Sequence, residues 1–223
     1  MGVDQLGEQA AARWDQPDAG IWEYRGREAV HTHSSLLCWA ACDRLALIAG
    51  RLGLQTKYQQ WRTRADKIRA AILEQAWSDK RKAFVATFGG EALDASLLLM
   101  PNLGLIDAKD PRFAATVERM EQELLHDGHY IYRYVEPDDF GRPANAFTVC
   151  TFWYAEAIAM QGRVEEAREL FEHLLSRRNS LGLLAEDLDT KTGELWGNFP
   201  QTYSMVGLIH TAARLSRSWK GAF

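Results

Sequence analysis

The sequence predicts an all-α protein in which helices follow one another in antiparallel succession. Apolar residues recur at helical spacing along most of the 223 residues, and strand-like alternation is scarce. Very apolar helices also mix with amphipathic ones, which indicates inner helices buried on most sides and outer helices buried on one side. The pattern favours two concentric layers of helices, as in an α/α toroid, with a simple bundle as the alternative.

Seven helices are expected, separated by short loops. Their ranges are 34–52, 55–77, 92–100, 111–125, 147–161, 164–175 and 199–215. The first is nearly all apolar and ends near Gly53, and the second carries Trp61, Ile68 and Ile72 at helical spacing. These two helices should therefore pack against each other.

The later helices follow from proline positions and apolar stripes. Pro101 should stop the third helix, and Pro111 lies near the first turn of the fourth, where proline is favoured. The fifth and seventh are very apolar, whereas the sixth has a single apolar stripe. Between them we expect a short extended piece in 82–93 and irregular loops over 129–145 and 179–198.

Composition excludes several classes of protein. Hydrophobic residues make up 47% and charged residues 25%, which is ordinary for a globular chain and not for a disordered or fibrous one. The net charge of −4 argues against a nucleic-acid binder. No apolar run of about 18 residues predicts a membrane span, and the first residues lack the apolar core of a signal peptide.

Three cysteines are too few, and odd in number, for a disulfide framework. They fit a reducing compartment, so we expect a cytoplasmic protein. Cys38 and Cys42 lie four residues apart on an apolar helix. We interpret them as buried free thiols, with a metal or redox pair as the alternative.

Glu23 is a candidate general acid. It follows Trp22 in a loop bounded by glycines, and a carboxyl beside an indole is expected to be partly desolvated, which raises its pKa. Such a group can give up a proton near neutral pH. The alternative is a surface glutamate next to a core tryptophan.

Two further loops carry candidate residues. Glu186, Asp187 and Asp189 cluster after an apolar run, but the alternating oxygen ligands of a calcium loop are absent, and a solvated acidic turn is the alternative. Arg133 lies among tyrosines and is either a ligand clamp or part of a structural ion pair.

Taken together, the loops favour glycoside hydrolysis. One carboxyl group protonates the leaving oxygen and a second activates water, while tryptophan, tyrosine and arginine side chains bind sugar. The spacings of catalytic metal sites, of a serine nucleophile elbow and of a phosphate loop are all absent from the sequence. We therefore expect no metal and no cofactor. His31 and His33 flank a helix start and are expected to pack a loop.

Five motifs point to a known family. In chain order they are PDAGIWEYRG, HTHSSLLCWAACDRLALIA, LDASLLLMP, RYVEPDDFG and GLLAEDLDTKTGELWGNFPQTYS. Together they resemble glycoside hydrolase family 15, which includes glucoamylases, glucodextranases and some bacterial trehalases. The resemblance implies an (α/α)6 toroid that hydrolyses α-glucosidic bonds with inversion.

The resemblance also implies roles for individual residues. Glu23 matches the family's general acid, Glu186 its general base, and Arg133 the arginine that contacts sugar. An inverting pair leaves room for water, so the carboxyl groups of Glu23 and Glu186 should lie roughly 6.5–9.5 Å apart. We also expect substrate contacts from four aromatic or cationic residues, which are Trp22, Arg25, Tyr134 and Tyr203.

The match covers only part of the family's toroid. About seven of its twelve helices are present, and the earlier helices with their glucose-gripping Arg-Asp motif are not. Residues 1–223 therefore look like one catalytic domain truncated at its N-terminus. The apolar faces of 34–52 and 147–161 should then be exposed, which favours self-association.

The functional prediction is an inverting α-glucoside hydrolase, or a fragment of one. Its substrate would be an α-glucan or an α-linked disaccharide such as trehalose, and a fragment alone should have weak or no activity. The alternatives are an inactive carbohydrate-binding remnant and a helical interaction module without a sugar site.

Overall fold

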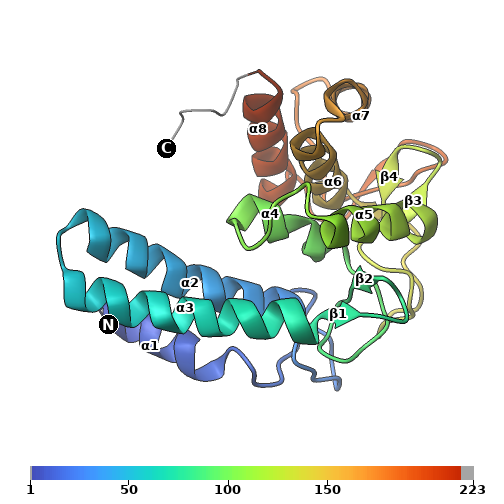
Figure 1. The fold of residues 1–223 in the computed structure, drawn as a ribbon. Helices are drawn as coiled ribbons and strands as arrows, with labels where there is room; N and C mark the ends of the chain where they lie inside the picture. Colours follow the sequence, from blue (N-terminus) through green and yellow to red (C-terminus); the bar gives the residue numbers. More distant parts are fainter. Residues whose placement is uncertain (1, 217–223) are drawn as a thin grey trace. The chain divides into compact units, whose positions relative to one another are not determined.

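The computed structural model describes residues 2–216, which form eight α-helices, one 3-10 helix and seven two-residue strands (Figure 1). The predicted all-α class is confirmed, although the expected helix count is one too low. The described residues divide into two compact units. Unit 1 comprises 2–92 and 103–105, and unit 2 comprises 93–102 and 106–216.

Unit 1 is built on three helices. They are α1 (Val3–Arg13), α2 (Thr32–Arg51) and α3 (Gln55–Gln75). The helices α2 and α3 run side by side in opposite directions, and α1 packs against both (Figure 1). Gly7 permits the close approach of α1, because a Cβ atom there would overlap Leu45 and lie 2.7 Å from the Trp61 ring. The predicted core residues Trp61, Ile68 and Ile72 are all buried.

The expected helices do not include α1. This helix buries only Gly7, so it lacks the large buried side chains by which the other helices are predicted. Its start is held locally, because the Gly2 backbone N–H donates to the side-chain oxygen of Gln5 at 3.0 Å. Tertiary contact with α2 and α3, rather than amphipathic patterning, therefore defines this helix.

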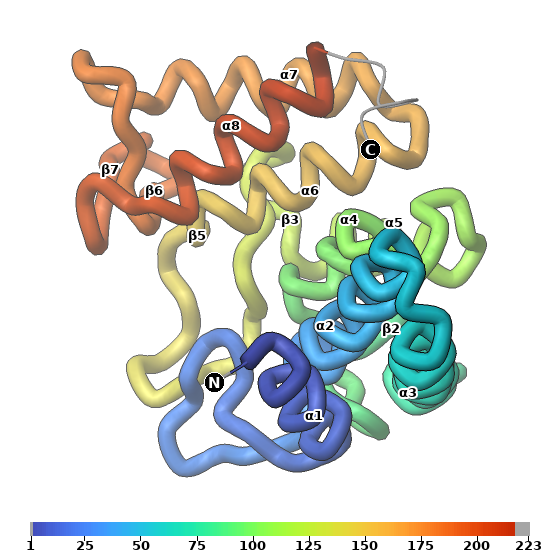
Figure 2. Tube along the Cα trace, turned by 90° about the vertical axis from the view of Figure 1, so that its left-hand side faces the viewer, coloured from blue at the N-terminus to red at the C-terminus, as the bar shows by residue number. Residues whose placement is uncertain are grey.

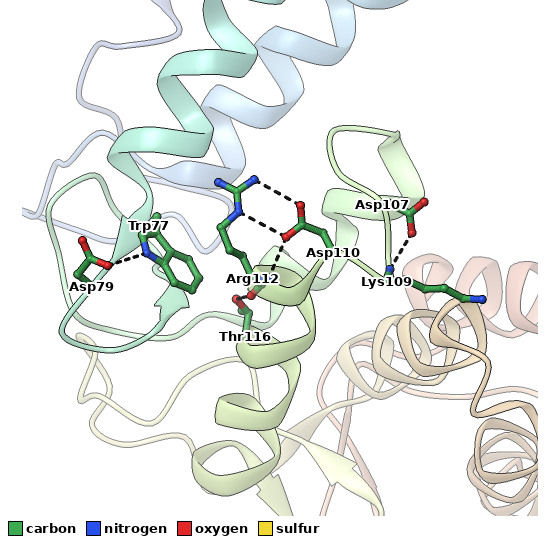
Figure 3. A network of polar contacts seen from close by, with 7 residues as sticks. All are labelled: Trp77, Asp79, Asp107, Lys109, Asp110, Arg112 and Thr116. Atoms are coloured by element: carbon green, nitrogen blue, oxygen red, sulfur yellow. Dashed lines mark hydrogen bonds and ion pairs between the residues drawn. The ribbon is translucent and has the colours of Figure 1, made fainter.

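Unit 1 ends in a small hairpin. The strands β1 (Trp77–Ser78) and β2 (Ala83–Phe84) pair antiparallel, which confirms the extended piece predicted after the second helix. The Trp77 indole N–H donates to Asp79 at 3.2 Å beside this hairpin (Figure 3).

Unit 2 is organised around a buried helix. In chain order, the elements that follow the hairpin are η1 (Ala95–Leu98), α4 (Leu99–Leu103), α5 (Pro111–Glu123), β3 (Leu125–His126), β4 (Tyr130–Ile131), β5 (Ala146–Phe147), α6 (Thr148–Gln161), α7 (Val164–Ser176), β6 (Asp187–Leu188), β7 (Leu195–Trp196) and α8 (Thr202–Ser216). The helices α6, α7 and α8 pack on one another (Figure 2). The strands β5, β6 and β7 form an antiparallel sheet whose register pairs Phe147 with Asp187 and Asp187 with Trp196.

Proline behaves differently at its two predicted positions. Pro111 begins α5 as expected, and the Asp110 carboxylate caps this helix by accepting from the Arg112 backbone N–H at 2.9 Å (Figure 3). Pro101, by contrast, lies inside α4 and does not stop it. The third residue of a helix has no intrahelical N–H bond to lose, so proline is compatible with that position.

The last helix begins later than predicted, at Thr202 instead of Phe199. The Gln201 backbone N–H donates to the Leu184 carbonyl at 3.0 Å, which ties the preceding segment to the loop before β6. This tie matters for the candidate site below.

Exposed large apolar side chains lie on α1, α2, α7 and α8. On α2, Leu37, Leu47 and Ile48 are 47–50% exposed, as predicted. The same prediction is wrong for α6, because α7, α8 and η1 cover it. On α8, Tyr203 and Ile209 are at least 60% exposed instead. Self-association through such faces stays a prediction.

Two further expectations concern the environment of the chain. Among the helices of residues 2–216, none is long and apolar enough to cross a membrane. All three cysteines are free thiols, of which Cys42 and Cys150 are buried and Cys38 is half-buried.

Candidate active site

The loop before α2 holds three of the predicted site residues, Trp22, Glu23 and Arg25. A backbone bridge between Asp18 and Ala29 closes this loop, and the Gly20 N–H donates to the Asp18 carboxylate at 2.8 Å. Gly20 has φ +69°, and a Cβ atom there would lie 2.9 Å from the His31 ring. The turn therefore requires glycine at this point.

Glu23 has an unusual backbone. Its φ of +55° lies in the left-handed region, which non-glycine residues seldom adopt and which recurs at functional sites. Its backbone N–H donates to the Gly20 carbonyl at 3.1 Å. The side chain is exposed, so the predicted desolvation by Trp22 is wrong for this structure. Arg25 is also exposed.

Aromatic and cationic side chains pack the base of this loop. Tyr24 stacks on His31 at 5.9 Å between ring centroids, and the Arg27 guanidinium lies 4.7 Å from the Tyr24 ring centre. Burial lowers the pKa of His33 to about 4. The two histidines therefore pack the loop as expected, whereas Tyr24 was not singled out from sequence.

In unit 2, the backbone of Glu186 is fixed on both sides. Its N–H donates to the Asn198 carbonyl at 3.0 Å, and its carbonyl accepts from the Thr148 N–H, the first residue of α6, at 2.8 Å. Glu186 thus directly precedes β6 and is held between the segment after β7 and the start of α6.

The Glu186 carboxylate is held by three donors. Oε2 accepts from the Asn198 backbone N–H at 3.1 Å and from its side-chain amide at 2.9 Å, and Oε1 accepts from the Gln201 amide at 3.2 Å. Asn198 and Gln201 were missed from sequence. The only signal for them was two amides around a Phe-Pro pair, immediately before a predicted helix.

The acidic cluster around Glu186 does not act as a unit. Burial, reinforced by the Glu186 charge and opposed by Arg133, raises the pKa of Asp187 to about 6. Asp189 instead accepts the backbone N–H groups of Lys191 and Thr192 in a turn. Within residues 2–216 no group of three or more His, Cys, Asp or Glu side chains could hold a metal ion.

Arg133 and Tyr134 share one partner, Asp138. The Asp138 Oδ2 atom accepts from the Arg133 guanidinium at 3.1 Å and from the Tyr134 hydroxyl at 2.6 Å, and its side chain is 7% exposed. The Arg133 guanidinium also lies 5.0 Å from the Tyr134 ring centre and 6.0 Å from that of Phe147. Asp138 was not predicted from sequence.

The contacts among Arg133, Tyr134 and Asp138 shift the pKa values of Asp138 and Tyr134. Burial is the largest influence on Asp138 and acts against ionisation, yet the hydrogen bonds from Tyr134, Phe140 and Arg133 together lower its pKa. Burial, with the bond to Asp138, raises the pKa of Tyr134 to about 12. Tyr134 thus stays a hydrogen-bond donor at neutral pH.

Asp138→Ala is expected to lower the free energy of unfolding by about 1–3 kcal/mol, because it removes the carboxylate that accepts from the Tyr134 hydroxyl and the Arg133 guanidinium. Urea unfolding measures the change. Glu136→Ala is the matched control, since Glu136 is an exposed acid of the same loop. Equal stability of the two variants would contradict the role of Asp138.

Unit 2 brings three predicted residues to one sheet. Glu186 precedes β6, Arg133 lies over the Phe147 ring on β5, and Tyr134 is held through Asp138. Tyr203 is the second residue of α8 and is 65% exposed. Glu23 belongs to unit 1, so its pairing with Glu186 at roughly 6.5–9.5 Å stays a prediction.

The family model described as glycosyl hydrolases family 15 matches residues 3–213. The chain belongs to this family. Among curated members, it is 37% identical over 97% of its length to a trehalase of Thermoplasma volcanium and 41% identical over 95% to a trehalase of Mycobacterium tuberculosis.

The family 15 chain also shares its fold with solved structures. It resembles a bacterial glucoamylase complexed with acarbose with a TM-score of 0.79 at 16% identity, over 96% of this chain and 37% of that one. The likeness confirms the α/α-toroid fold class. The chain spans 35% of the first trehalase and 31% of the second.

Proposed function

We propose that this family 15 chain supplies the general acid, the general base and a sugar-binding arginine of an inverting α-glucoside hydrolase. The observation that carries the proposal is the Glu186 carboxylate, which three donors hold in one orientation at the start of β6. The same sheet contains Phe147, whose ring centre lies 6.0 Å from the Arg133 guanidinium. A carboxylate in an incidental surface turn has no need of such fixation.

The proposed reaction needs two carboxyl groups in opposite protonation states. Glu23 gives its proton to the leaving glycosidic oxygen, while Glu186 removes a proton from a water on the other face of the sugar. The exposed position of Glu23 and its left-handed backbone suit a group that meets a substrate. Trp22, Arg25, Tyr134 and Tyr203 are the proposed substrate contacts beside Arg133.

The names of the relatives guide the choice of substrate. The two curated relatives are trehalases and the solved neighbour is a glucoamylase. An α-linked disaccharide, with trehalose first, is therefore the proposed substrate, and a short α-glucan is the second. A cytoplasmic location fits the three free thiols and is part of the same proposal.

A second candidate is a carbohydrate-binding remnant without turnover. The chain spans about a third of the length of the two trehalases, and this observation favours the second candidate. Binding of trehalose without release of glucose would establish this alternative. A helical interaction module is disfavoured, because it has no use for a carboxylate that three donors hold in one orientation.

The stereochemistry of the product tests the mechanism. We expect maltose to release β-glucose from its non-reducing end, and trehalose to give one β-glucose and one α-glucose, because inversion acts on one of its two α-linked carbons. Proton NMR of the anomeric signals, recorded before mutarotation, distinguishes these outcomes. Release of α-glucose alone from trehalose would refute inversion.

A further inference from the structure

The hydrogen bonds on the Glu186 carboxylate are unevenly shared between its two oxygens. Oε2 accepts two N–H groups of Asn198, at 3.1 and 2.9 Å. Oε1 accepts one, from Gln201, at 3.2 Å. Each carboxylate oxygen offers about two lone-pair positions. The lone pairs of Oε2 are thus both occupied, and Oε1 keeps one that is open.

From this pattern we infer that Oε1 is the atom that removes the proton from the attacking water, and that Asn198 and Gln201 are positioning residues that select it. The inference rests on the proposed function, in which Glu186 is the general base. It adds the reacting atom and two further residues.

The step balances as follows. One O–H bond of the water breaks and its proton goes to Oε1, while the water oxygen forms a bond to the anomeric carbon. The glycosidic C–O bond breaks with its electron pair on the leaving oxygen, which takes the proton of Glu23. Glu186 ends protonated and Glu23 ends ionised.

The two amides can select an oxygen because their own backbones are fixed. The Asn198 carbonyl accepts from the Glu186 N–H at 3.0 Å, so donor and acceptor belong to one closed loop. The Gln201 N–H donates to the Leu184 carbonyl at 3.0 Å, and the Gln201 carbonyl accepts from the Met205 N–H of α8 at 3.2 Å. Both side chains therefore start from anchored positions on either side of the carboxylate.

Gly197 completes the arrangement. It has φ +78°, and a Cβ atom there would lie 2.8 Å from Glu186 Oε2. Any other residue would strain the backbone and push on the oxygen that Asn198 holds. Gly197→Ala is therefore a second way to displace the carboxylate, and it removes no donor.

The test uses three variants of the full-length protein. Asn198→Ala and Gln201→Met each remove an amide, and Gly197→Ala moves the carboxylate. Each is expected to lower kcat by about 10–100-fold with KM within about threefold, because small misplacements of a catalytic group are this costly. Gln122→Met, at an exposed position of α5, is the matched control and should leave kcat unchanged.

A second background separates positioning from general structure. In the presence of Glu186→Gln, none of the three substitutions should lower kcat further, since each acts through the Glu186 carboxylate. α-Glucosyl fluoride keeps the residual rate measurable because fluoride is a good leaving group. Thermal unfolding of each variant reports its folded state independently of activity.

The outcomes distinguish the two proposals. The positioning role would be overturned by an equal fall in kcat in both backgrounds, by a rise in KM without a fall in kcat, or by no change in either. Undiminished activity of Glu186→Gln by itself would overturn the proposed function. If one variant fails to fold, the remaining two still decide the matter.

Discussion

Glu186→Gln is expected to lower turnover of trehalose by about 10²–10⁴-fold, the usual contribution of a general acid or base. The amide keeps the shape of the side chain but has no oxygen able to remove a proton from water. Sugar affinity should change little, because Arg133 and Tyr134 are held by Asp138 and not by Glu186. The measurement is glucose release under saturating trehalose, together with the affinity for glucose.

Glu194→Gln is the appropriate comparison. Glu194 is an exposed acid that directly precedes β7, in the same hairpin of the sheet. It should keep the activity of the unmodified protein. A loss of similar size in both variants would mean that general disturbance of the loop, not removal of the base, explains the effect.

Periodicity in the sequence was sufficient for most of the fold. It predicted α2, α3, α5, α6 and α7 because each carries an apolar face or an apolar core. It failed for α1, whose one buried residue is a glycine fitted against two side chains of other helices. It also misjudged Pro101, since the tolerance of a helix for proline depends on where the helix starts.

The candidate site was predictable only in part. The resemblance assigned Glu186 and Arg133, and the structure gives both of them fixed partners in unit 2. Those partners, Asn198, Gln201 and Asp138, escaped notice because a hydrogen bond between loops depends on how the loops close. The expected desolvation of Glu23 failed for the same reason, since adjacency to Trp22 in sequence does not bury a side chain.

Glu23→Gln is expected to show a loss that depends on the leaving group. In trehalose and maltose the leaving group is a second glucose, which is a poor leaving group as an alkoxide and needs a proton. Turnover of these two substrates should therefore fall by about 10²–10⁴-fold. A 4-nitrophenyl α-glucoside releases a stable 4-nitrophenolate that needs no proton, so its turnover should fall far less. The control is Glu28→Gln, at an exposed acid of the same loop, which should leave both rates unchanged.

The ratio of the two rates is the decisive quantity in this experiment. If Glu23 protonates the leaving oxygen, its removal must separate the two substrates, because only one of them needs the proton. Both substrates need the base to activate water in the same displacement, so Glu186→Gln should lower both rates to a similar extent. An equal loss for both substrates in Glu23→Gln would assign Glu23 to sugar binding or loop structure. A selective loss would identify it as the acid.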